Sequence, residues 1–292
     1  NVGGNGFTIN NTANCTIKGL SIHSFQYQGI KITGVSATNN VLLGNYIGVR
    51  MDGETAPFPT SRQSGIQINN APGNYVGDGT AAGRNVLSGN GASSPGGGID
   101  IVGVNSLNNF VLGNYIGTDE TGNTYVGNEG IGIEVRNGAS YTTIGGASVL
   151  DRNVVSGNNY IAGIFFSNGG SYNTIEGNYV GVGADGSTSI PNNGNGVRVT
   201  DANSLFNTIS ANIINNNTGR GITLGCGNNN KDFPVILSET ATTISGTCES
   251  GDIIEVFDAG TGDQGQTYLG TAVTTGTTWS LTGTFNTSNN FT

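Results

Sequence analysis

A short motif, glycine followed by apolar–x–apolar, returns seven times along this chain and constrains its fold more than any other feature. The glycines of successive copies are 36, 33, 34, 31, 33 and 25 residues apart. Self-similarity at roughly 20 to 50 residues is the signature of a repeat protein. The copies begin at Gly29, Gly65, Gly98, Gly132, Gly163, Gly196 and Gly221.

Each copy is too short, and too rich in Ile and Val, for a helix, so it predicts a β-strand. Alternation along a strand places the two apolar side chains inward and the residue between them outward. One inner file is then Ile30, Ile66, Ile99, Ile133, Ile164, Val197 and Ile222. The second inner file is Ile32, Ile68, Ile101, Val135, Phe166, Val199 and Leu224. The outward column is Lys31, Gln67, Asp100, Glu134, Phe165, Arg198 and Thr223.

These files predict an all-β solenoid, a parallel β-helix of about seven coils. Stacked β-branched side chains about 4.8 Å apart fill a narrow core without large residues. The 51 glycines and the abundant asparagines of the chain are expected at turns, where positive φ is needed.

A second element, Gly-Asn-Tyr, lies upstream of alternate copies, at Gly44, Gly113 and Gly177. Because its asparagine holds a fixed place in the coil, its amide is expected to bond to asparagines in the coils above and below. The steps of 69 and 64 residues between these elements indicate that the repeating unit is a pair of coils.

The run Gly-Asn-Tyr-Ile-Gly-Thr-Asp-Glu-Thr-Gly at 113–122, with Arg-Asn-Val-x-Ser-Gly-Asn at 84–90 and 152–158, resembles a known repeat. It is similar to the right-handed parallel β-helix repeats of large bacterial extracellular surface proteins, which share the pectate-lyase-like superfold. The resemblance covers roughly residues 5–225 and implies a right-handed helix in a secreted or cell-surface protein. That helix also carries lyases, epimerases, phage tailspikes and adhesins, so no catalytic residue transfers with it.

The repeat motif ends after the last coil and a different residue pattern begins, which predicts two domains, 1–228 and 229–292. The second contains short apolar runs separated by turn residues, and it resembles the Ig-like β-sandwich modules that follow such helices. Its length of about 60 residues suggests that further strands follow Thr292 in a longer chain. Cys226 and Cys248 flank the junction, where a disulfide and two reduced thiols are the alternatives.

Asp100 and Glu134 are neighbours in the outward column, with their backbones expected about 4.8 Å apart. Paired carboxylates at that spacing suit a retaining glycoside hydrolase, and they also suit Ca²⁺, which takes oxygen ligands. Arg136 is expected on the same face, where it is a candidate base for a polysaccharide lyase. The alternative is a solvated column in which Arg136 screens the two acids.

Tyr46, Tyr115 and Tyr179 follow the asparagines of the Gly-Asn-Tyr elements, at the bases of long loops. Regularly repeated tyrosines are candidates for stacking on sugars or on a neighbouring copy of the chain.

The net charge of −9, with only ten Lys and Arg residues, argues against nucleic acid as a partner. The absence of an apolar run of about 18 residues argues against membrane insertion. The favoured hypothesis is a non-catalytic extracellular adhesin, structural or filament protein whose partners are surface glycans, polysaccharide or further copies of itself. The alternative is a polysaccharide lyase or glycoside hydrolase that uses Asp100, Glu134 and Arg136. No cofactor is expected apart from an optional Ca²⁺.

Overall fold

The computed structural model describes residues 4–50, 52, 63–91 and 96–292. The chain divides into two compact units, Asn1–Asn229 and Asn230–Thr292. Among the described residues, no helix is long and apolar enough to cross a membrane.

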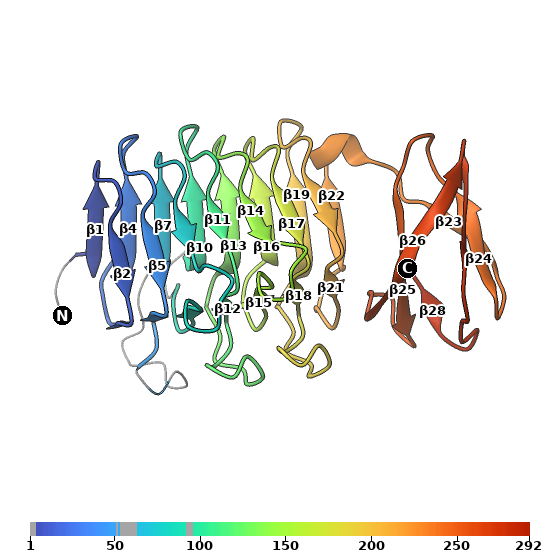
Figure 1. Cartoon of the computed structure of the whole chain (residues 1–292), viewed down its shortest axis with the longest axis horizontal. Helices are drawn as coiled ribbons and strands as arrows, with labels where there is room; N and C mark the ends of the chain where they lie inside the picture. The colour runs from blue at the N-terminus through green and yellow to red at the C-terminus, as the bar shows by residue number, and fades with distance from the viewer. Residues whose placement is uncertain (1–3, 51, 53–62, 92–95) are drawn as a thin grey trace. The chain divides into compact units, whose positions relative to one another are not determined.

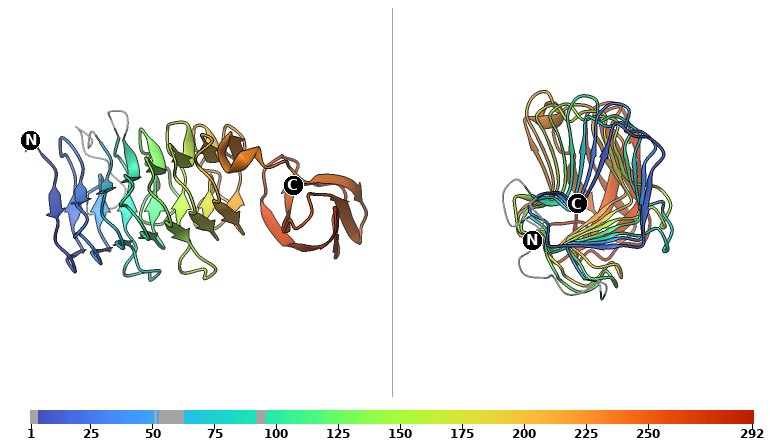
Figure 2. Two further views of the ribbon diagram at one scale, coloured as in Figure 1. Left: turned by 90° about the horizontal axis from the view of Figure 1, so that it is seen from above. Right: turned by 90° about the vertical axis from the view of Figure 1, so that its left-hand side faces the viewer.

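The first unit is a right-handed parallel β-helix whose coils follow one another in Figure 1 from blue to orange. Three parallel sheets form its walls, and the end-on view in Figure 2 superposes the coils. Sheet A contains β1 (Phe7–Asn10), β4 (Ile30–Thr33), β7 (Ile66–Asn69), β10 (Gly97–Val102), β13 (Ile131–Arg136), β16 (Ala162–Ser167), β19 (Asn195–Thr200) and β22 (Ile222–Gly225). Sheet B contains β2 (Thr16–Lys18), β5 (Val41–Leu43), β8 (Tyr75–Val76), β11 (Phe110–Val111), β14 (Thr143–Gly145), β17 (Thr174–Glu176) and β20 (Thr208–Ser210). Sheet C contains β3 (Ser21–Ile22), β6 (Tyr46–Ile47), β9 (Val86–Leu87), β12 (Tyr115–Ile116), β15 (Val154–Val155), β18 (Tyr179–Val180) and β21 (Ile213–Ile214).

The strand register of sheet A confirms the two inner files and the outward column. Ile66 pairs with Ile30 on one side and with Ile99 on the other, and the first file continues in this way to Ile222. Inner side chains of the central coils are fully buried, whereas Ile222 in the last coil is 37 % exposed. Sheet A also has an eighth strand, β1, whose Gly6-Phe7-Thr8-Ile9 fits the same motif.

An asparagine ladder runs along each of the three corners of the helix, whereas the sequence predicts only one ladder. In each, side-chain amides donate to the Oδ1 of the asparagine in the next coil. The expected ladder, before sheet C, is confirmed and consists of Asn45, Asn85, Asn114, Asn153, Asn178 and Asn212. The ladder before sheet B contains Asn40, Asn74, Asn109, Asn173, Asn207 and Asn228, with Thr142 in the middle. The ladder before sheet A contains Asn90, Asn128, Asn158, Asn192 and Asn217.

The second unit is an antiparallel sheet that follows a tight turn, η1 (Gly227–Asn230), in which Asn228 and Asn229 have positive φ. Its strand order is β23-β24-β27-β26-β25-β28. The long strand β26 pairs with β25 through its first part and with β27 through its last, so the sheet bends around a core that contains Trp279. Its strands are β23 (Val235–Glu239), β24 (Thr243–Thr247), β25 (Ile254–Gly260), β26 (Thr267–Thr275), β27 (Thr278–Thr282) and β28 (Asn290–Phe291).

The disulfide between Cys226 and Cys248 and two reduced thiols remain the two alternatives at the junction. Cys15 is a partly buried thiol in the first unit. Cys226 lies in the first unit and Cys248 in the second, where it packs against the core of the bent sheet.

Candidate functional site

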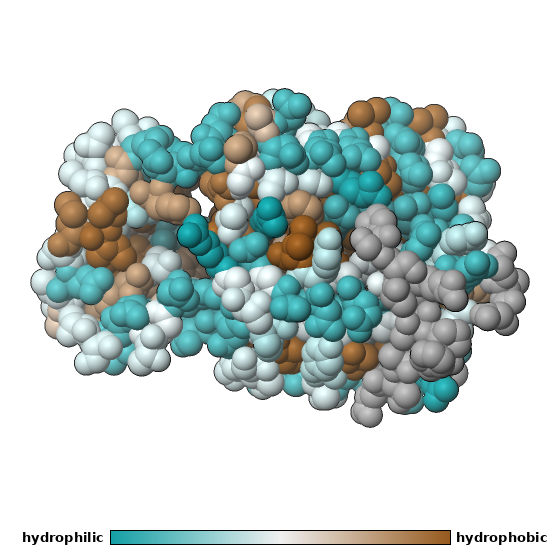
Figure 3. All heavy atoms as spheres, turned by 180° about the vertical axis from the view of Figure 1, so that it is seen from behind, coloured by the Kyte–Doolittle hydropathy of each residue, from teal (hydrophilic) through white to brown (hydrophobic). Residues whose placement is uncertain are grey.

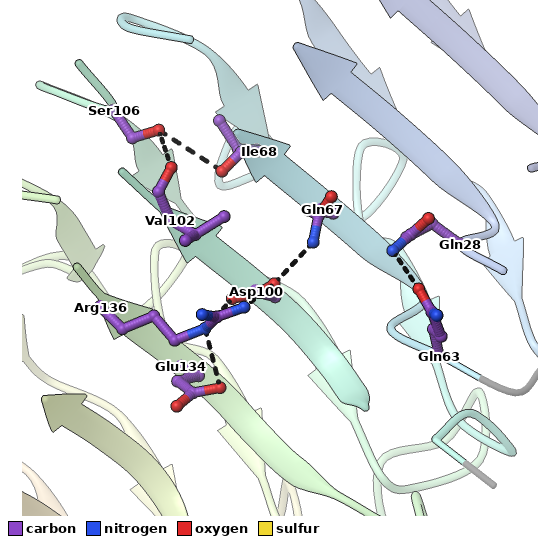
Figure 4. Close-up of polar contacts among 9 residues, drawn as sticks. All are labelled: Gln28, Gln63, Gln67, Ile68, Asp100, Val102, Ser106, Glu134 and Arg136. Carbon is purple, nitrogen blue, oxygen red and sulfur yellow. Dashed lines mark hydrogen bonds and ion pairs between the residues drawn. The ribbon is translucent and has the colours of Figure 1, made fainter. Parts of the chain in front are cut away.

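The two acids of the outward column lie side by side on the outer face of sheet A. Asp100 of β10 and Glu134 of β13 are partners in the strand register, and Gln67 of β7 precedes them. Arg136 stands two residues beyond Glu134, so its side chain emerges on the same face (Figure 4). The structure therefore brings Asp100, Glu134 and Arg136 together, as their spacing in the sequence predicts.

Asp100 is held on both of its carboxylate oxygens. Arg136 donates from Nε to Oδ1 at 3.0 Å and from its terminal nitrogen to Oδ2 at 3.1 Å, and Gln67 donates to Oδ2 at 2.8 Å. The Asp100 side chain is only 7 % exposed. A two-point contact between guanidinium and carboxylate is among the strongest hydrogen-bonded pairs in proteins. A carboxylate engaged and buried in this way is poorly placed to attack a substrate.

Glu134 makes a longer contact with the same arginine than Asp100 does. Its Oε2 lies 3.4 Å from Arg136 Nε, and its side chain is 13 % exposed. Burial, and then the charge of Asp100, raise the pKa of Glu134 to about 7, although Arg136 acts in the opposite direction. Burial lowers the pKa of Arg136. The hydrogen bond and charge of Asp100, together with the charge of Glu134, outweigh burial, so the pKa is raised overall. Glu134 therefore changes charge near neutral pH.

A hollow of about 240 Å³ opens beside Glu134 on this face. Figure 3 shows the face, with hydrophobic and hydrophilic residues next to one another around the hollow over the middle coils. Aromatic rings and carboxylates contribute to the walls, together with backbone from close-packed coils. The lining residues are Gly91, Gly96, Glu129, Gly130, Ile131, Glu134, Tyr160, Ile161 and Phe165.

Sequence reasoning placed Phe165 in the outward column but did not recognise it as part of a site. The sequence did contain an indication of this role, because Phe165 and Glu134 are neighbours in the outward column, which places an apolar ring next to a carboxylate. Tyr160 carried no such signal, since it lies before β16, outside the repeated motif. Its ring is 47 % exposed.

The arrangement around Asp100 and Glu134 does not favour calcium. Arg136 contacts both carboxylates and so supplies the positive charge that a cation would supply. Within residues 4–50, 52, 63–91 and 96–292, no group of three or more His, Cys, Asp or Glu side chains is arranged to hold a metal ion.

The three tyrosines singled out by their spacing lie on sheet C, away from this hollow, and are largely covered. The guanidinium of Arg84 lies 4.2 Å from the ring centroid of Tyr115, and Tyr115 is only 8 % exposed. Arg152 lies 4.0 Å from the ring centroid of Tyr179. The hydroxyl of Tyr46 donates to Glu120 at 3.0 Å. These contacts engage the rings of Tyr115 and Tyr179 and the hydroxyl of Tyr46 within the protein.

No protein-family model matches the chain, and no curated protein matches it either. The hollow offers aromatic surface and a carboxyl group that is protonated over part of the physiological pH range. Two acids line the hollow, Glu129 and Glu134, whereas Asp100 lies outside the lining and is committed to Arg136 and Gln67.

Proposed function

We propose that this protein is a non-catalytic, secreted or cell-surface β-helix protein that binds a glycan in the hollow on sheet A. In this role it acts as an adhesin or a structural component, and the coils of the helix are a rigid support for the site. The observation that carries the proposal is the pairing of aromatic and carboxyl groups, Phe165 and Tyr160 with Glu134, around one hollow.

The chemistry of sugars supports this assignment. A sugar ring has apolar C–H faces and polar edges, so its sites combine aromatic surface with a few placed polar groups. The volume of the hollow, about 240 Å³, lies just below the range of about 300 to 1,000 Å³ that is usual for small-molecule sites, so it suits a small group. One sugar ring is therefore a suitable occupant, with the rest of a chain extending over the neighbouring coils.

The test is a panel of polysaccharides measured for binding and for cleavage with the full chain and two variants. Phe165→Ala removes a ring from the hollow, and we expect it to lower affinity about tenfold or more. Phe110→Ala is the matched control, because Phe110 also points outward and is partly buried, but on sheet B. Equal loss in both variants, or none in Phe165→Ala, would remove the hollow as the binding site.

A second candidate function, a polysaccharide lyase or glycoside hydrolase, is favoured by one observation. A carboxyl group whose pKa lies near 7 is suited to general acid catalysis at neutral pH, and Glu134 has that property. This candidate predicts cleavage of a polymer that is lost in Glu134→Gln while binding persists. The binding proposal predicts no new reducing ends and no unsaturated products from any polymer in the panel.

A further inference from the structure

The side chains around the hollow are acidic and aromatic. Glu129 and Glu134 contribute carboxyl groups, and Tyr160 and Phe165 contribute rings. Among the described residues that line the hollow, none carries a positive charge. The glycines in the lining are explained by packing, since a Cβ on Gly130 would lie 1.2 Å from the backbone oxygen of Gly96. The side chains therefore carry the specificity.

Among the described residues, two arginines lie near this surface. Arg136 is engaged with Asp100, whereas the buried Nε of Arg198 has no hydrogen-bond partner. Arg136 makes its two-point contact with Asp100 and only a longer contact with Glu134. Arg198 lies with its guanidinium carbon 5.6 Å from the ring centroid of Phe165. In the register of sheet A, Arg198 is on the opposite side of Phe165 from Glu134. The hollow itself is lined by both Phe165 and Glu134.

The charge of the lining separates the classes of sugar. An anionic sugar would bring a second negative charge close to Glu129 and Glu134, which is unfavourable where water is partly excluded. A neutral sugar would leave Glu134 with only its partial contact to Arg136. A cationic group gains both a carboxylate partner and attraction to the faces of aromatic rings.

We propose that the sugar bound in the hollow carries a free amine, and that its ammonium group lies between the Glu134 carboxylate and the rings of Tyr160 and Phe165. This inference rests on the proposed glycan-binding function and names the ligand class of that same site. The ligand is a glycan that contains unacetylated amino sugar units, such as an oligomer of glucosamine.

Binding of the ammonium group is coupled to the protonation state of the Glu134 carboxyl. Because the pKa of Glu134 is raised to about 7, part of the population is neutral at pH 6.5. An ammonium beside the carboxylate stabilises its charged form, so binding releases a proton. Two charged groups of the described residues contact or flank Glu134 directly: Asp100 on the adjacent strand β10 and Arg136 on the same strand β13. Glu129 lies in the lining of the hollow, and Arg198 lies beyond Phe165.

Calorimetry at pH 6.5 in two buffers of different ionisation enthalpy tests this assignment. The probes are glucosamine hexamer and N-acetylglucosamine hexamer, which differ in charge and acetylation. We expect the amine form to bind about tenfold tighter or more and to release a proton. Glu134→Gln is expected to abolish both the preference and the proton release. Glu176→Gln, the same substitution on sheet B, is the matched control and is expected to change neither.

Tyr160→Ala provides a variant at an exposed residue, so its effect does not depend on repacking the helix; we expect a severalfold loss of affinity for the amine form. Equal affinity for the two hexamers, with binding still lost in Phe165→Ala, overturns the amine assignment and leaves the glycan-binding proposal in place. No binding of any glycan overturns both. Binding of hexalysine as tightly as glucosamine hexamer overturns the sugar and identifies a cationic peptide instead.

Discussion

At the scale of single residues, the site depends on how one arginine is divided between two acids. Arg136 satisfies Asp100 at two points and reaches Glu134 at 3.4 Å, so the two carboxyl groups have different roles despite their equivalent positions. The sequence predicted that Asp100, Glu134 and Arg136 share one face, because alternation along a strand determines the face. It could not predict the division, which depends on side-chain rotamers and on Gln67 in the adjacent coil.

Replacing Glu134 by Gln should stabilise the protein in a pH-dependent way. Glu134 has a pKa of about 7 when folded against the ordinary value of 4.5, so the folded state binds its proton more tightly than the unfolded state does. The stability that this protonation contributes is complete below pH 4.5 and is lost as pH rises to about 7. We therefore expect Gln to match Glu at pH 4 and to gain about 3 kcal/mol at pH 8.

Urea denaturation at the two pH values measures this difference, with Glu176→Gln as the control for the general effect of losing a surface acid. An advantage for Glu134→Gln that is the same at pH 4 and pH 8 would show that Glu134 is not held neutral by its surroundings.

Asp100→Asn should destabilise the chain by about 2 kcal/mol, because it leaves the partly buried guanidinium of Arg136 without its main partner. The same change should lower the pKa of Glu134, since it removes the charge of Asp100 and frees Arg136 to pair with Glu134. Urea denaturation at pH 7 gives the stability, and an NMR titration of the Glu134 carboxyl carbon gives the pKa. Unchanged values for both quantities would contradict the structural role given to Asp100.

At the scale of elements, the strands of sheet A were predictable and the corners were only partly so. A two-residue alternation repeated in every coil determined the inner files, and the same motif at Gly6 was available for β1. One asparagine ladder was predicted because three of its members, Asn45, Asn114 and Asn178, follow a glycine in a repeated tripeptide. Asn74 lies in the same tripeptide, Gly73-Asn74-Tyr75, but belongs to the ladder before sheet B, so the tripeptide alone does not determine the corner. Asn128 of the ladder before sheet A lies outside any such tripeptide.

The ladder before sheet B has one defect, at Thr142. Its backbone donates to Asn173 Oδ1 at 2.8 Å, but its own buried hydroxyl has no hydrogen-bond partner. It provides neither an amide oxygen to accept from Asn109 nor a side-chain amide to donate to Asn173. Thr142→Asn should complete the ladder and stabilise the chain by about 1 kcal/mol. Thr143→Asn, the same substitution at the next, outward-facing position, is the control. A urea midpoint that fails to rise in Thr142→Asn would argue against an energetic role for the ladder.

At the scale of the whole first unit, the repeating unit of two coils explains why sheet A, and not sheet C, has an open outer face. Loops leave alternate coils after Gly117 and Gly181 and contact each other, since Ala184 N donates to Gly122 O at 2.9 Å. Val126 and Ala184 from these loops pack against the outer side chains of sheet C. Sheet C is thereby covered, whereas the outer face of sheet A retains the hollow beside Glu134 (Figure 3).

The most direct test of this account is a crystal structure of the protein with the oligosaccharide from the panel that binds it most tightly. We predict electron density for a sugar ring in the hollow on sheet A, against the ring of Phe165 and within hydrogen-bonding distance of Glu134. Density for the sugar at any other surface of either unit, with the hollow empty, would contradict the central claim.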